Sequence, residues 1–158
     1  MEPSRPAPPL ALTELDGRRL TADRSRWPAL LTFFHTGCET SLLAAPFLER
    51  FHGSYSPHGV WVTAVSQDPP EPTTRFAEEM GWTLPVLLDP HGVASRDYDL
   101  KWVPTLYWID RDGRVMAPLV GFDAAEYNEL AARIASELEV APVEIVSPED
   151  GVPDFRPG

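Results

Sequence analysis

The chain has 158 residues and a formal net charge of −11, and this length suits one domain with a single sizeable core. The acidic excess argues against binding to nucleic acid or to an anionic membrane surface, because both depend on Lys and Arg. No run of about 18 apolar residues occurs, so no membrane-spanning helix is expected. The N-terminus has no basic segment followed by an apolar one, which predicts a cytoplasmic protein without a secretory signal.

Cys38 is the only cysteine in the sequence, so an internal disulfide is excluded and nothing requires an oxidising compartment. The four histidines are scattered, with none of the short spacings typical of a metal site. No glycine-rich phosphate-binding loop is present. We therefore expect neither a metal nor a cofactor.

Composition divides the chain into three parts. Residues 1–9 are proline-rich and predict an extended N-terminal segment. Residues 10–138 carry the periodic patterns of a folded domain. Residues 139–158 are again proline-rich and predict an extended tail, which Ile145, Val146 and Phe155 could anchor on the surface.

The first half of the domain predicts a strand–helix–strand unit. Two short strands with an Asp-Gly turn between them come first. The apolar run at residues 29–34 is typical of a strand buried on both faces. A helical pattern covers residues 40–52, and a second apolar, β-branched run covers residues 60–66. A helix between two buried strands predicts a parallel pair joined by a crossover.

The second half predicts more helices and an antiparallel addition to the sheet. Its expected elements are a helix at 73–81, a short strand or extended connection at 84–89, a helical turn near 92–100, a β-hairpin around residues 111–113 and a helix at 122–140. Asp123 and Glu126 resemble a capping box at the start of the last helix. The whole order predicts an α/β domain with a mixed β-sheet flanked by helices.

The segment FFHTGCETS, residues 33–41, places Cys38 between the first buried strand and the following helix. Backbone N–H groups at a helix N-terminus favour an ionised thiol, which is the nucleophilic form. Glu39 and the acidic net charge oppose this effect. Cys38 is therefore either a reactive thiol or, on the simpler interpretation, a small buried apolar residue.

The order of elements, together with Cys38, Pro46 eight residues later, and the segment WVPTLYWIDRDGRV at 102–115, resembles the thioredoxin-like superfamily. The similarity covers roughly residues 8–138 and is greatest to its redoxin and TlpA-like thiol-disulfide oxidoreductase branch. It implies a catalytic Cys38, and it implies that Pro104 is a cis-proline facing this cysteine. The substrate-binding residues would then be Val103, Pro104, Trp102 as a wall of the groove, and Thr36 in the loop before the cysteine.

The sequence also departs from that pattern. The second cysteine of the usual Cys-x-x-Cys motif is Ser41, whose hydroxyl could either hydrogen-bond the Cys38 sulfur or satisfy a backbone group in the first helical turn. The resemblance places an acid at Asp68, either as a proton shuttle to Cys38 or as a solvated loop residue. His35 could stabilise the thiolate or simply pack in the loop. Positions His35 and Leu31 do not match the peroxiredoxin signature.

Two functions follow from these features. The first is a monothiol redox protein, in which Cys38 attacks a disulfide or a peroxide and an external thiol restores it. Ser41 would be part of that catalytic site. Its partners would be proteins or low-molecular-weight thiols and disulfides. The alternative is a thioredoxin-fold binding module without turnover, which the missing second cysteine favours.

Overall fold

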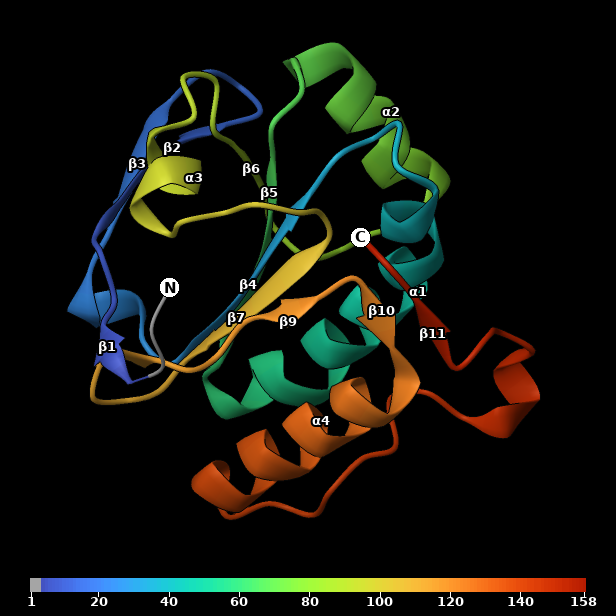
Figure 1. The fold of residues 1–158 in the computed structure, drawn as a ribbon. Helices are drawn as coiled ribbons and strands as arrows, with labels where there is room; N and C mark the ends of the chain where they lie inside the picture. Colours follow the sequence, from blue (N-terminus) through green and yellow to red (C-terminus); the bar gives the residue numbers. More distant parts are fainter. Residues whose placement is uncertain (1–3) are drawn as a thin grey trace.

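The computed structural model describes residues 4–158, and a twisted sheet runs through its centre (Figure 1). The strands of this sheet lie in the order β1-β8-β7-β4-β5-β6-β2-β3, with β9 also paired to β7. Their bounds are β1 Arg5–Pro6, β2 Leu10–Glu14, β3 Arg19–Ala22, β4 Ala29–Phe34, β5 Trp61–Ser66, β6 Val86–Leu88, β7 Thr105–Ile109, β8 Arg114–Val115 and β9 Leu119–Val120. A separate pair consists of β10, Phe122–Asp123, and β11, Phe155–Arg156.

The centre of the sheet is parallel and its flanks are antiparallel. Strand β4 pairs in parallel with β5 along its whole length, and β5 pairs in parallel with β6. On its other side β4 pairs antiparallel with β7. The predicted parallel pair and the mixed α/β sheet are therefore confirmed, and the continuous apolar run of β4 reflects burial on both faces.

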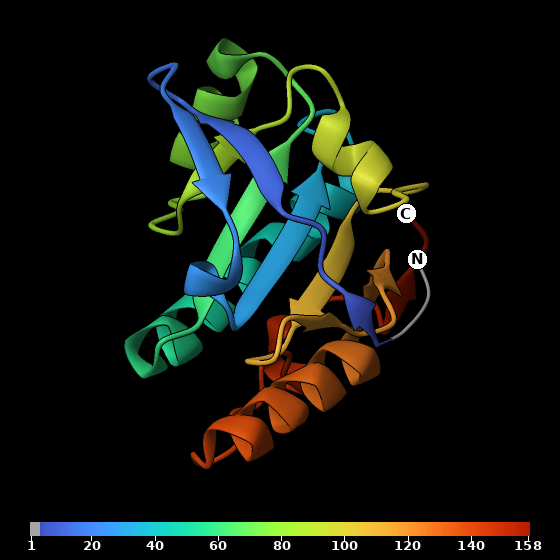
Figure 2. The ribbon, with the colours of Figure 1, turned by 90° about the vertical axis from the view of Figure 1, so that its left-hand side faces the viewer.

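Helices cover both faces of the sheet (Figures 1 and 2). Their bounds are α1 Glu39–Tyr55, α2 Pro70–Glu79, α3 Val93–Asp97 and α4 Ala124–Leu138. Alternate side chains of β4 point to opposite faces: Leu30 and Phe34 join the core under α1, α2 and α4, whereas Leu31 and Phe33 join the core under α3. Among residues 4–158 no helix is long and apolar enough to cross a membrane.

The helix ends follow from local sequence. Helix α2 begins at Pro70, three residues before its predicted start, because proline is well suited to the first turn of a helix. Gly81 follows this helix with φ of +65°, a left-handed conformation that glycine adopts without a steric penalty. The Asp123 side chain accepts a hydrogen bond from the Glu126 N–H, as the capping pattern predicts for α4.

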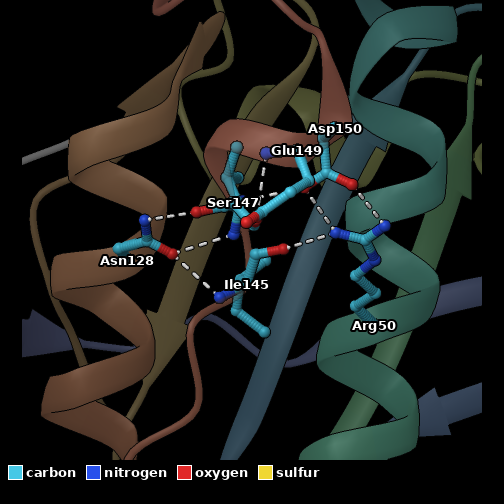
Figure 3. A network of polar contacts seen from close by, with 7 residues as sticks. Arg50, Asn128, Ile145, Ser147, Glu149 and Asp150 are labelled. Carbon is cyan, nitrogen blue, oxygen red and sulfur yellow. Dashed lines mark hydrogen bonds and ion pairs between the residues drawn. The ribbon is translucent and has the colours of Figure 1, made fainter.

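The C-terminal segment packs against the domain. Residues 139–158, all of them described, contain no α-helix, and Ile145 and Val146 are buried in the main core. The Asn128 amide of α4 bonds the backbone of both residues, and Arg50 of α1 donates to the Ile145 carbonyl and to the Asp150 carboxylate (Figure 3). These bonds fix a stretch of backbone that has no regular partner strand.

At the other end of the chain, Arg5 and Pro6 form a two-residue strand on β8 at the sheet edge. The predicted N-terminal extension was residues 1–9, and its first three residues lie outside the described part of the chain.

Candidate functional site

Cys38 is the N-cap residue of α1, at the end of the loop that leaves β4. Its sulfur accepts a hydrogen bond from the Ser41 N–H at 3.4 Å, and its carbonyl accepts from the Leu42 N–H at 3.0 Å. The residue as a whole is only partly buried. The Ser41 N–H therefore meets the sulfur at the N-terminus of α1, where the first backbone N–H groups have no acceptor within the helix.

The loop before β7 faces this sulfur. The Cys38 Sγ atom lies 3.6 Å from the Val103 carbonyl oxygen, to which the protonated thiol donates. The following Val103–Pro104 peptide bond is cis, and Pro104 is buried. The pairing of β4 with β7 brings Cys38 and Val103 together. Because Phe33 of β4 pairs with Thr105 of β7, the loops next to these two residues lie at the same end of the sheet.

Ser41 is 2% exposed and lies in the first turn of α1. Its hydroxyl accepts a hydrogen bond from the His35 N–H at 3.4 Å, while its own N–H is the donor to Cys38. The hydroxyl therefore takes the second of its two predicted roles, satisfying a backbone group. The contact with the sulfur comes from the main chain.

Asp68 holds the loop that carries the cysteine. One of its carboxylate oxygens accepts from the Thr36 N–H at 2.8 Å, and the other lies 3.2 Å from His35 Nε2. His35 Nδ1 accepts from the Gly37 N–H at 2.9 Å, which places the proton of the neutral ring on Nε2, facing Asp68. With its side chain only 14% exposed, Asp68 is not a solvated loop residue.

Sequence reasoning named His35 and Asp68 separately and missed their pairing. His35 directly follows β4 and Asp68 lies two residues after β5, and the last residues of these strands, Phe34 and Ser66, are paired in register. Because the carboxyl ends of neighbouring parallel strands meet at one edge of a sheet, the predicted parallel pairing was a signal that the two following loops lie together, but it did not show which of their residues meet.

Trp102 remains largely outside the core, with 62% of its surface exposed. It lines a shallow, mainly apolar hollow together with Val120 and the tail residues Phe155, Pro157 and Gly158. The structure therefore brings together four of the predicted site residues: Cys38, Ser41, Val103 and Pro104. The bond between Asp68 and the Thr36 N–H supports the adjacent loop. Trp102 lies at the rim of the site. Within residues 4–158 no group of three or more His, Cys, Asp or Glu side chains could hold a metal ion.

The amino-acid sequence is similar to those of known thiol-disulfide oxidoreductases. The sequence is 30% identical over 118 residues to the thiol-disulfide oxidoreductase ResA of Geobacillus thermodenitrificans, covering 73% of this chain and 67% of that protein. A match to ResA of Bacillus anthracis is 25% identical over 131 residues, covering 82% and 76% of the two chains.

Among solved structures, a putative thiol:disulfide interchange protein DsbE from Chlorobium tepidum superposes with a TM-score of 0.78 at 27% identity. That alignment covers 87% of this chain and 99% of the other. A putative protein disulfide isomerase from Bacteroides thetaiotaomicron has a TM-score of 0.77 at 22% identity, covering 88% and 91%, and shows the shared fold. Both agree with the thioredoxin-like α/β fold described above.

The AhpC/TSA family matches residues 3–117, the part of the chain that includes the cysteine, the Asp68 loop and the cis Val103–Pro104 bond. This match covers well over half of the sequence, and the protein belongs to the AhpC/TSA family.

Proposed function

We propose that this protein is a thiol-disulfide oxidoreductase in which Cys38 is the only nucleophile and an external thiol completes the cycle. The observation that carries the proposal is the placement of the Cys38 sulfur. It accepts the Ser41 N–H, lies 3.6 Å from the Val103 carbonyl oxygen and belongs to a residue that is only partly buried. The likeness to ResA and to the DsbE-like interchange protein supports the same class of reaction.

The reaction follows from thiol chemistry. The Cys38 thiolate attacks one sulfur of a disulfide, forming a bond from Cys38 to that sulfur and releasing the other sulfur as a thiolate, which takes up a proton. An external thiolate then attacks the mixed disulfide. Cys38 leaves as a thiolate, and the sulfur of the external thiol becomes joined to the substrate sulfur that Cys38 had held, in a new disulfide. Electrons are conserved at each step, and no cofactor is needed.

Ser41 makes the external thiol necessary. In a dithiol site, the residue at this position attacks the mixed disulfide from within the protein. A serine hydroxyl cannot do so, and the Ser41 hydroxyl is already engaged with the His35 amide. We place the protein in the cytoplasm, where a pool of reduced thiols would supply this step.

Val103 and Pro104 are the groups we assign to substrate binding. The cis bond sets the Val103 carbonyl beside the sulfur, where ionisation of Cys38 ends the S–H hydrogen bond to that oxygen. The carbonyl is then available to an N–H donor of a bound polypeptide, as in strand addition. Trp102 would contribute an apolar contact at the rim.

Asp68 acts as a positioning residue in this proposal. Its bonds go to the Thr36 amide and the His35 ring, which hold the loop leading to Cys38. These contacts favour control of loop geometry over direct proton transfer to the sulfur.

The experiment that tests this function is a brief incubation with oxidised glutathione followed by mass spectrometry of the intact protein. One glutathione should add to the native protein and none to Cys38→Ala. The adduct should persist until reduced glutathione is supplied. A protein that gains no adduct would refute the proposal, and conversion of Cys38 to sulfenic acid by peroxide without any disulfide exchange would favour a peroxidase instead.

A further inference from the structure

The last residues of the chain lie directly beside the candidate site. The Thr40 hydroxyl, two residues after the cysteine, donates to the Pro157 carbonyl at 2.7 Å. Arg156 forms an ion pair with Glu39, the residue next to Cys38. The tail is therefore attached to the same first turn of α1 that holds the thiol.

The end of the tail also reaches the loop before β7, which faces Cys38 across the site. A Cβ atom built on Gly158 would lie only 2.8 Å from the Val103 carbonyl oxygen. That same oxygen is 3.6 Å from the Cys38 sulfur. Figure 2 shows the C-terminus beside the yellow loop that precedes β7. Residues 156–158 thus span from the start of α1 to the cis-proline loop.

The tail is held in an extended conformation by main-chain pairing. Strand β11 is antiparallel to β10, with Phe155 opposite Asp123 and Arg156 opposite Phe122. A Cβ atom on Gly121 would lie 2.7 Å from the Arg156 carbonyl oxygen, so a glycine is needed for this close approach. Extended backbone beside a reactive cysteine is the geometry in which a polypeptide substrate would bind by strand addition.

We propose that Phe155–Gly158 occupies the groove that an extended segment of a protein disulfide substrate would use. The tail must then leave before a polypeptide reaches Cys38, whereas a small disulfide or alkylating reagent needs far less room beside this partly buried residue and would react without that step. This inference rests on the proposed function, since it identifies the substrate groove of the same thiol.

The contacts that hold the tail differ sharply along its length. Residues Ile145, Val146 and Asp150 are fixed by buried side chains and by Arg50 and Asn128 (Figure 3). Beyond Gly151, Val152 packs against the main core and the Asp154 carbonyl accepts from the Ala124 N–H at 2.8 Å. Residues 155–158 are all exposed, and their attachment consists of a two-residue strand, one hydroxyl bond and an exposed ion pair. Exposed ion pairs contribute little to stability and short strands open readily. The last residues can therefore detach while the rest of the tail stays in place.

Arg156→Glu in the full chain tests the inference, because it replaces the ion pair with repulsion from Glu39. Arg111→Glu, in the exposed turn at the far end of β7 from Pro104, is the control with the same charge change. In each protein, the alkylation rate of Cys38 is measured with iodoacetamide and with a polymer-bearing maleimide. The ratio of the two rates removes any effect of charge on the thiol itself.

We expect Arg156→Glu to raise the ratio of large-reagent to small-reagent rate by about tenfold, the change expected if the tail covers the groove nine-tenths of the time. Hydrogen exchange at residues 154–158 should become faster in the same variant, and Arg111→Glu should match the native protein in both measurements. An unchanged ratio, or unchanged exchange of the tail amides, overturns the inference. Failure of every protein to form a glutathione adduct would instead refute the proposed function, whatever the ratio.

Discussion

The sulfur of Cys38 lies 3.6 Å from the carbonyl oxygen of Val103, although 65 residues separate them in the chain. The antiparallel pairing of β4 and β7 brings them together, and the helix that starts at Cys38 supplies the Ser41 N–H from the other side. One sulfur thus accepts a hydrogen bond from the start of α1 and, as a thiol, donates one to the loop before β7. These two contacts fix the position of the Cys38 side chain between the two segments.

Restoring a second thiol should convert the site into a dithiol reductase. We expect Ser41→Cys to raise the rate of insulin reduction, with dithiothreitol as the electron source, by roughly tenfold or more, because an internal thiol releases the mixed disulfide without waiting for a second molecule. Ser41→Ala is the control, since it also removes the hydroxyl but adds no sulfur. Equal activity of Ser41→Cys and Ser41→Ala would show that release is not the slow step.

Removing the charge of Asp68 should loosen the cysteine loop. Asp68→Asn keeps the size of the side chain but weakens the bonds to the Thr36 amide and the His35 ring. We expect a loss of about 1.5–3 kcal/mol in the free energy of unfolding, since hydrogen bonds to charged groups contribute about that much. Urea unfolding measures it, with Asp112→Asn in an exposed turn as the control. A loss no larger than that of the control would mean that Asp68 does not hold the loop.

Apolar patterning was sufficient to predict the central sheet. The apolar runs at 29–34 and 60–66 indicated buried strands, and the intervening helix predicted a parallel connection, which the structure has. The cysteine motif likewise located Cys38 at the helix start. These features are encoded locally, in stretches of a few residues each.

Contacts between distant loops were harder to predict. The His35–Asp68 pair depends on the register of β4 against β5, which composition does not reveal. The path of the tail depends on one asparagine and one arginine that bond its backbone. Its apolar residues were predicted as surface anchors, but Ile145 and Val146 are buried in the main core and Phe155 is 58% exposed, because a proline-rich segment has no periodicity that shows how deeply such residues lie. Such side-chain-to-backbone bonds leave no pattern in the sequence.

Burial of the tail makes a direct prediction for stability. Ile145 is 0% exposed and belongs to the main core, so Ile145→Ala should lower the free energy of unfolding by about 2–4 kcal/mol. Val143→Ala is the matched control, because Val143 is 41% exposed and its truncation should change stability by less than about 0.5 kcal/mol. Chemical denaturation measures the free energy of unfolding of both variants. Equally small losses in the two would indicate that the tail does not unfold cooperatively with the rest of the domain.

Acid should weaken the anchor that Asp150 provides. The Arg50 guanidinium, which bonds both carboxylate oxygens, and the Ser147 N–H lower the pKa of Asp150 from 3.8 to about 2. Because the folded-state pKa is depressed, the bond stabilises the protein fully above pH 3.8, and this contribution is lost as the pH falls toward about 2. Asp150→Asn should therefore be less stable than the native protein near neutral pH. The two stabilities, measured by urea unfolding at a series of pH values, should converge below pH 3.8. A difference that stayed constant down to about pH 2 would contradict the role of the charged pair.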